Sequence, residues 1–183
     1  MIRDEAWNLL CEYTQGDSLR KHAIAVESVM RAYACKLNEN EEKWGIVGLL
    51  HDFDYEKYPG ADQHPFVGSK ILEEKGYPED VRRAILGHAT YTGIPRDTPL
   101  ARYLYACDEL CGFITAVALV RPNKKLAEVE VKSVVKKLKD KSFARSVNRQ
   151  DITQGIAELG IPEEDHIQFV IQTMIGIADK IGL

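Results

Sequence analysis

The sequence has few cysteines, no long hydrophobic run and no sustained strand-like alternation. Four cysteines among 183 residues are too few for a disulfide scaffold, and none is spaced as Cys-x-x-Cys, so neither a zinc knuckle nor a thioredoxin-type redox site is indicated. The longest apolar run, Leu110 to Val120, is shorter than the roughly 20 residues of a transmembrane helix. The start of the chain is too acidic and polar for a secretory signal. We therefore expect a soluble, cytoplasmic protein without a membrane partner.

The charge of the chain is small but unevenly distributed. A formal net charge of −4 argues against a general nucleic-acid binder. The stretch from Arg121 to Arg149 nevertheless contains ten basic and three acidic residues, against 14 and 25 in the remainder. Such a stretch can face an anionic substrate or partner, or it can be the solvated face of an amphipathic helix. We favour the second interpretation and expect no specific nucleic-acid partner.

Nearly every segment repeats its apolar residues with a helical period, which predicts an all-α fold. The pattern favours about nine helices, over residues 3–14, 18–37, 41–52, 64–76, 79–90, 98–120, 126–139, 149–159 and 163–181. The segment Arg121-Pro122-Asn123 is the best internal boundary. We expect a single domain over residues 1–183, with a core at about 18–120 and a basic C-terminal helical cap at about 121–183.

Ionisable residues lie on the apolar faces of several predicted helices, where a buried imidazole or carboxylate must find a partner. The inward-facing set comprises His22, His51, Asp52, His64, His88 and Asp108. The fifth histidine, His166, falls outside the face that its predicted helix turns to the core. That inner face is formed by Ile167, Val170, Ile171, Met174 and Ile175.

Any one of these six residues alone is most simply explained as a satisfied core histidine or a buried cap. Six together favour a bound cation, since a metal takes nitrogen and oxygen lone pairs that are expensive to bury unpaired. Histidine and aspartate without cysteine suit Fe, Mn, Co or Zn better than an all-oxygen Ca or Mg cage. Gly48 and Gly68 lie one turn from His51 and His64, where a missing side chain allows either close approach at a crowded site or simple helix packing.

The ordered series of His22, the doublet His51-Asp52, His88 and Asp108 resembles the HD-domain superfamily of metal-dependent hydrolases. The resemblance covers roughly residues 18 to 115 and implies an all-helical HD-type fold. The chain is similar to uncharacterised HDIG-type proteins, although Phe53-Asp54 stands where that label has Ile-Gly.

The segment that begins at His64-Pro65, together with His88, resembles the branch of the superfamily that holds two metals. The resemblance implies that one ion is bound by His22, His51, Asp52 and Asp108. It implies that the second is bound by His64 and His88, with Asp52 as the bridge. Hydrolases of diadenosine tetraphosphate and mixed-valent di-iron oxygenases share this ligand layout, so two divalent transition-metal ions are expected, with iron favoured.

As a hydrolase, such a site would activate a water for attack on a phosphate ester or anhydride, with Asp52 among the catalytic residues. The candidates for holding the phosphoryl charge are Lys57, Arg20, Lys21 and Arg96, each of which can equally be a surface charge. Asp54 is a candidate for orienting a ligand histidine or shuttling a proton, and equally a solvated helix end. Tyr91 and Thr92 either line the pocket or pack in their loop.

Three functions remain from different classes. We favour a phosphohydrolase acting on a small phosphorylated molecule such as a nucleotide. The alternatives are a di-iron oxygenase, and a non-catalytic sensor or interaction module that keeps its metal for stability. Consumption of O₂ would identify the oxygenase, and salt-sensitive binding to an anionic macromolecule without turnover would identify the module.

Overall fold

The computed structural model describes residues 2–183, and helices are the only regular secondary structure in that range. The α-helices are α1 (Arg3–Tyr13), α2 (Asp17–Leu37), α3 (Glu41–Leu50), α4 (Phe66–Glu74), α5 (Glu79–His88), α6 (Pro99–Leu119), α7 (Val131–Leu138), α8 (Arg149–Leu159), α9 (Glu163–Ile175) and α10 (Ala178–Ile181). The short 3-10 helices η1 (Thr90–Thr92) and η2 (Leu126–Glu128) lie beside α5 and before α7. The all-α prediction is confirmed. The last predicted helix is divided into α9 and α10, and no described helix is long and apolar enough to cross a membrane.

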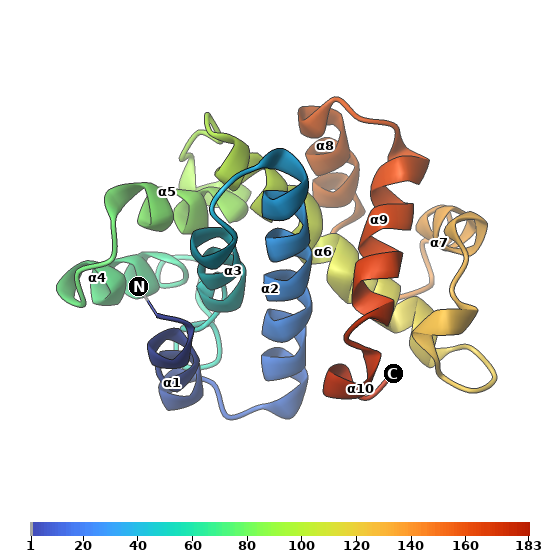
Figure 1. Cartoon of the computed structure of the whole chain (residues 1–183), viewed down its shortest axis with the longest axis horizontal. Coiled ribbons are helices and arrows are strands. Elements are labelled where there is room, and N and C mark those ends of the chain that lie inside the picture. Colours follow the sequence, from blue (N-terminus) through green and yellow to red (C-terminus); the bar gives the residue numbers. More distant parts are fainter. Residues whose placement is uncertain (1) are drawn as a thin grey trace.

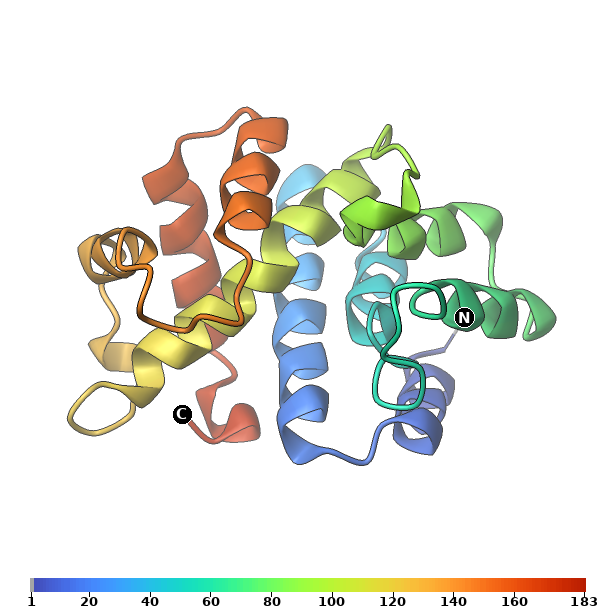
Figure 2. The same ribbon diagram turned by 180° about the vertical axis from the view of Figure 1, so that it is seen from behind.

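Helices α2 and α6 form the centre of the molecule. In Figure 1, α1, α3, α4 and α5 lie on one side of α2, and α7, α8 and α9 lie on the other. Figure 2 shows α6 running diagonally across α2, so that it contacts elements of both sides. The segment 51–65, between α3 and α4, lies on this same face of the molecule (Figure 2).

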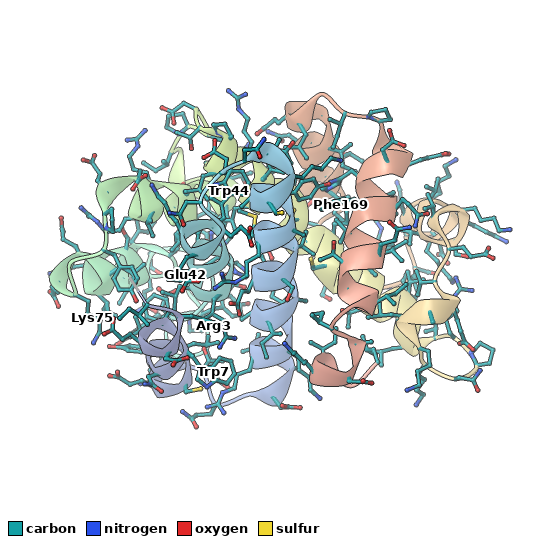
Figure 3. The ribbon with its side chains drawn as sticks, in the orientation of Figure 1. Arg3, Trp7, Glu42, Trp44, Lys75 and Phe169 are labelled. Carbon is teal, nitrogen blue, oxygen red and sulfur yellow. The ribbon has the colours of Figure 1, made fainter. Side chains whose placement is uncertain are left out.

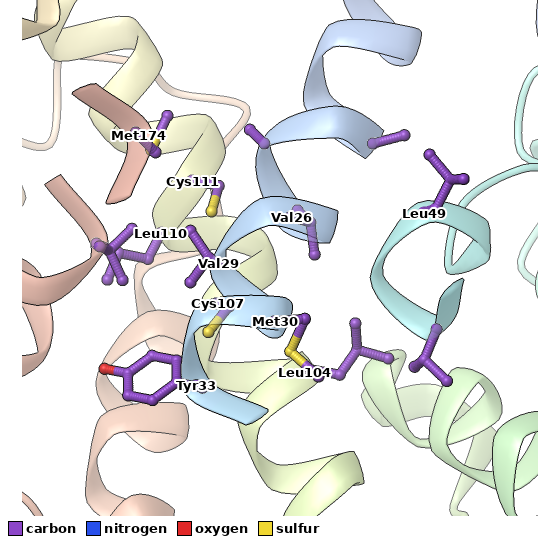
Figure 4. Packing of buried hydrophobic residues seen from close by; sticks show 14 of the residues in the cluster. Val26, Val29, Met30, Tyr33, Leu49, Leu104, Cys107, Leu110, Cys111 and Met174 are labelled. Atoms are coloured by element: carbon purple, nitrogen blue, oxygen red, sulfur yellow. The ribbon is translucent and has the colours of Figure 1, made fainter. Parts of the chain in front are cut away.

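The apolar core fills the space between these two helices and their neighbours. Met30 of α2 and Leu104, Cys107 and Cys111 of α6 are completely buried in it (Figure 4). Both cysteines behave as small core residues, and burial raises the pKa of each thiol.

Local sequence signals fix where the central helices begin and end. The side chain of Thr98 accepts a hydrogen bond from the Ala101 N–H at the start of α6, and Pro99 occupies the first helical turn. Asn148 caps α8 in the same way, by accepting from the Gln150 N–H. Gly160 ends α8 in the left-handed conformation, which glycine adopts without steric cost. These caps place the N-terminus of α8 against the middle of α6.

Two glycines allow helices to cross at very short range. A Cβ atom at Gly48 of α3 would lie 2.9 Å from the Val26 carbonyl oxygen of α2. A Cβ at Gly155 of α8 would lie 2.7 Å from the Cα atom of Ala106 of α6. At either position, a residue larger than glycine would force the backbones of the two helices apart. The first crossing draws the end of α3, and with it His51, towards α2.

An ion-pair cluster ties the first three helices together. Glu27 of α2 is almost fully buried and accepts from Arg3 Nε at 2.7 Å and from Arg31 Nε at 3.0 Å. Glu42 of α3 accepts from Arg31 Nη1 and from the Arg3 backbone N–H. Figure 3 labels Arg3 and Glu42 on the α1–α3 side of α2. A buried carboxylate with two guanidinium partners is well paired, so it holds this corner in one arrangement.

The prediction for His166 was wrong. Its side chain is completely buried, whereas Ile175, which was expected to face the core, is 40% exposed. The other four residues of the predicted inner face are buried, so the buried face of α9 begins one residue earlier than predicted and ends before Ile175. His166 Nε2 donates to the Ala106 carbonyl oxygen at 3.1 Å, and Tyr33 Oη donates to His166 Nδ1 at 2.6 Å. These two bonds satisfy a neutral imidazole, so this histidine is structural.

Candidate metal centre

The six residues predicted to bind metal come from five parts of the fold and meet in one place. His22 lies in the first turns of α2, His88 ends α5, and Asp108 lies midway along α6. His51 and Asp52 follow the last residue of α3, where the chain leaves the helix. The change from helix to turn at this point lets two neighbouring side chains reach one centre. His64 lies in the segment between α3 and α4, two residues before α4 begins.

The first ligand group consists of His22, His51, Asp52 and Asp108, whose donor atoms all lie within 4.8 Å of one another. Asp108 Oδ1 is 2.9 Å from His22 Nε2 and 3.2 Å from His51 Nε2. Asp52 Oδ2 is 3.4 Å from His51 Nε2. Three elements of the fold thus direct two imidazole nitrogens and two carboxylates at one point.

The second group consists of Asp52, His64 and His88. Asp52 Oδ1 lies 3.2 Å from His64 Nε2 and 3.1 Å from His88 Nε2, and the two nitrogens are 3.3 Å apart. Since Asp52 Oδ2 faces the first group, this carboxylate joins the two. The pattern matches the two-ion arrangement that the resemblance implied, with Asp52 as the bridge.

Hydrogen bonds on the far side of the rings fix which nitrogen faces the centre. His51 Nδ1 donates to the Gly48 carbonyl oxygen at 2.7 Å, and His88 Nδ1 donates to the Ile85 carbonyl oxygen. His64 Nδ1 donates to Asp54 Oδ1 at 2.8 Å. Carbonyl and carboxylate oxygens only accept, so each Nδ1 carries a proton and each Nε2 is left to present a lone pair.

The donor chemistry of the centre fits bound cations. His51 Nε2 is buried and has no hydrogen-bond partner among the described residues, although a ring nitrogen at zero exposure is costly to leave unpaired. His64 Nε2 and His88 Nε2 also face each other at 3.3 Å. A cation between such nitrogens removes both problems, and mixed imidazole and carboxylate donors suit first-row divalent ions.

The electrostatics of the centre favour positive charge. Burial opposes protonation of His64, but its contacts with Asp52 and Asp54 outweigh burial and raise its pKa to about 9. Burial likewise opposes protonation of His51, whose pKa is raised well above its usual value by the charges of Asp52 and Asp108. Burial disfavours the ionised form of Asp52, yet the neighbouring histidines hold its pKa well below its usual range. The carboxylates therefore remain ionised and attract either protons or metal ions.

A family model matches the part of the chain that carries the six candidate ligands. The sequence model of the HD domain matches residues 19–112, slightly more than half of the chain, and this range contains all six candidate ligands. The chain belongs to the HD domain family. Members of this family are generally metal-dependent hydrolases. Searches among curated proteins and among solved structures found no match.

The metal centre of this HD domain forms one wall of a cavity of about 400 Å³. His22, Asp52, His64, His88 and Asp108 line it, while His51 lies behind them. The remaining wall comes from Tyr55, Ala89, Thr90, Tyr91, Tyr105, Glu109, Gly112, Asn148 and Asp151. No lysine or arginine lines the cavity within residues 2–183, so positive charge there would come from bound ions and protonated histidines.

Asp54 of the HD domain is buried and serves as a support for His64. Its second oxygen accepts from the Gly68 N–H at 2.7 Å. A Cβ at Gly68 would lie 2.7 Å from the Asp54 carboxyl carbon, which explains why glycine is needed there, whereas Gly48 serves helix packing. Both Asp54 oxygens are thus engaged, and the residue does not line the cavity. Burial rules out the solvated helix end, and the contact with His64 fits the orienting role, while a role in shuttling a proton stays a prediction.

The four cations suggested for phosphate binding do not reach this cavity, because each has another partner. Lys57 Nζ lies 4.2 Å from the centre of the Tyr13 ring, and Arg20 Nε donates to the Thr14 carbonyl oxygen at 2.7 Å. Lys21 forms an ion pair with Asp17 at 2.7 Å. Arg96 donates two hydrogen bonds to Glu158, at 2.7 and 2.6 Å, and stacks on the Tyr105 ring. None of the four lines the cavity, so their contact with a phosphate at the metal centre stays an untested prediction.

Tyr91 does line the cavity, and its hydroxyl donates to the His64 carbonyl oxygen at 2.9 Å. Thr92 instead donates to the carbonyl oxygens of Leu86 and Ala89 and packs in its own loop. Of this pair, therefore, only Tyr91 has a place at the site.

The sequence reasoning missed the wall opposite the ligands. Tyr105 Oη donates to Asp151 Oδ1 at 2.9 Å, and the Asn148 side chain donates to the other oxygen at 2.8 Å. Glu109 accepts from the Asn148 N–H, and burial together with the Asp108 charge raises the Glu109 pKa to about 7. The spacing of Tyr105, Asp108 and Glu109 already puts them on one face of a helix. The contribution of α8 depends on tertiary packing that the sequence pattern does not show.

Proposed function

We propose that the chain is a metal-dependent phosphohydrolase that acts on a small phosphorylated molecule. The observation that carries this proposal is the pair of ligand groups joined by Asp52 at the wall of a 400 Å³ cavity. When bound, two divalent ions supply an activated water and neutralise phosphoryl charge. The residues of the chain hold that centre in place and shape the cavity around the substrate.

Charge counting supports two ions. Two divalent ions carry four positive charges against one negative charge each from Asp52 and Asp108, which leaves the centre at +2 before substrate binds. One ion alone would leave no net charge. Because no lysine or arginine in the described range lines the cavity, recognition of a phosphate dianion depends on occupancy of both groups.

The reaction adds water to phosphorus while the bond to the leaving oxygen breaks and that oxygen takes a proton. Asp52 fixes the relative position of the two ligand groups, and Asp54 fixes the ring of His64 through Nδ1. The Tyr91 hydroxyl holds the backbone carbonyl of the same histidine. Each of these contacts restricts a ligand before substrate arrives, which is the form of preorganisation that lowers a barrier.

Elemental analysis of the purified protein, followed on the same sample by a phosphatase and dinucleotide panel in air and without oxygen, tests this function. We expect close to two ions per chain and phosphate release that does not need oxygen. Asp52→Asn and His51→Ala should lose metal and activity together, and His64→Ala should lose mainly the second ion. Asp62→Asn, on the exposed part of the same segment, is the control. Oxygen consumption without phosphate release would refute the proposal and indicate the oxygenase.

A further inference from the structure

A second cavity, of about 730 Å³, lies beside the metal-centre cavity. It is formed by the start of α2, the C-terminal half of α6, the segment before α8 and the region of α10. Its walls are largely aliphatic. The aliphatic side chains that line it are those of Leu19, Ala116, Leu119, Ala144, Val147, Ile181 and Leu183. We refer to it as the aliphatic chamber.

The aliphatic chamber meets the metal-centre cavity at His22 and Gly112, which line both. Gly112 faces His22 across this junction: a Cβ built on Gly112 would lie 3.9 Å from His22 Cε1 and meet nothing nearer. The absence of a side chain at Gly112 thus leaves space beside a predicted metal ligand. The two cavities therefore adjoin at the position of Gly112.

The chemistry of the aliphatic chamber differs from that of the metal centre. Its charged lysine, Lys21, is paired with Asp17, so little net charge faces the interior. Leu119 is 49% exposed although it is a large apolar side chain on a wall of a cavity. The wall contributed by Ala144 and Val147 is held in place by Arg149, which donates to both of their carbonyl oxygens. The chamber is therefore a largely apolar surface that adjoins the candidate metal centre.

We propose that the aliphatic chamber holds the alkyl part of the substrate, so that the preferred substrate is an alkyl phosphate whose phosphoryl group lies at the metal centre. The proposal rests on the proposed phosphohydrolase function and names its substrate class. An alkyl chain fits better than a nucleobase, because no phenylalanine, tyrosine or tryptophan lines the chamber within residues 2–183, and its one ring, the His22 imidazole, is a predicted metal ligand. Burial of the chain would also cover Leu119.

Binding of methyl-, butyl- and hexylphosphonate to the Mn-loaded protein, measured by calorimetry, tests this assignment without relying on turnover. These probes carry a phosphoryl group that the enzyme does not release. We expect affinity to rise with chain length, up to roughly fourfold for each added methylene that is fully buried. Gly112→Val should place methyl groups in the junction and flatten the series, so that hexylphosphonate loses its advantage over methylphosphonate.

A second pair of variants keeps the test valid if the valine disturbs His22. Leu119→Asn alters the wall of the aliphatic chamber and should weaken hexylphosphonate but not methylphosphonate. Val120→Asn is the matched control, because Val120 is 59% exposed and does not line the chamber. Equal affinities for all three probes would overturn the alkyl proposal and leave the phosphohydrolase proposal standing. Failure of all three to bind would overturn both.

Discussion

Replacing His166 with glutamine is expected to change how the stability of the fold depends on pH. Burial, with the Lys36 charge acting in the same direction, outweighs the bond to the Ala106 carbonyl and lowers the pKa of His166 to about 4. A proton added at Nδ1 would also displace the one that Tyr33 donates there. The folded protein therefore keeps this imidazole neutral at pH values where an unfolded chain protonates it.

The sign and size of the effect follow from this difference. An unfolded histidine has a pKa near 6.5, so between about pH 6.5 and pH 4 the unfolded chain binds a proton that the folded protein does not. Stability from this residue is fully present above pH 6.5 and falls as the pH drops through that range. At 1.36 kcal/mol for each pH unit, a difference of about 2.5 units amounts to about 3 kcal/mol.

Urea unfolding of wild type and His166→Gln between pH 4 and pH 7, with chelator in both samples, measures this term. At pH 7 the variant should be less stable by about 1–3 kcal/mol, because Tyr33 and Ala106 lose a well-placed partner. That deficit should shrink by about 3 kcal/mol as the pH falls to 4, because glutamine binds no proton. The metal-ligand histidines titrate in both proteins and cancel in the comparison. Parallel stability curves would refute the reasoning.

Three further substitutions test the supports of the fold and the metal centre. Asp54→Asn should weaken binding of the second ion about 10–100-fold in metal titrations, because an amide cannot accept from both the His64 ring and the Gly68 N–H. Affinity for that ion equal to that of Asp62→Asn would contradict this. Glu27→Gln should lower the free energy of unfolding by about 2 kcal/mol, since two guanidinium groups lose their charged acceptor. The exposed Glu39→Gln should have no measurable effect on unfolding, and equal stability of the two would count against the cluster. Gly48→Ala should lower the free energy of unfolding by about 1–3 kcal/mol, because the added methyl group clashes with the α2 backbone. Gly112→Ala should be as stable as the wild type, and equal stability of Gly48→Ala and wild type would contradict the close crossing of α3 and α2.

The fold and the meeting of the six candidate ligands could be predicted because both follow from periodicity, whereas metal binding by these residues stays a prediction. Apolar spacing defines which face of a helix is buried, and the six ligands lie on such faces or at helix ends. His166 shows the limit of this reasoning. Its helix turns the predicted residues Ile167, Val170, Ile171 and Met174 to the core, but the buried face also includes His166, because Tyr33 of α2 and Ala106 of α6 supply polar partners there. Periodicity does not show such partners, since they come from distant parts of the chain.

The supporting charges could not be placed from the sequence for a different reason. Arginine and lysine side chains are long, so their direction is decided by whichever partner the fold brings near. Arg96 lies close in sequence to the ligand His88, yet its guanidinium is held by Glu158 of α8. In the same way Asn148 and Asp151 reach the cavity only because Gly155 lets α8 pack tightly on α6.

The ligands of the metal centre are far apart in the sequence, and His22 and Asp108 are separated by 86 positions although their side chains touch. An ion held by both would act as a cross-link that closes a long loop of the unfolded chain, where the entropy of closure is large. Metal binding and folding are then linked, because a ligand that binds only the folded state stabilises it by mass action. Removing the ions should lower the melting temperature of the protein, and the central helices α2 and α6 should separate more easily in the metal-free chain.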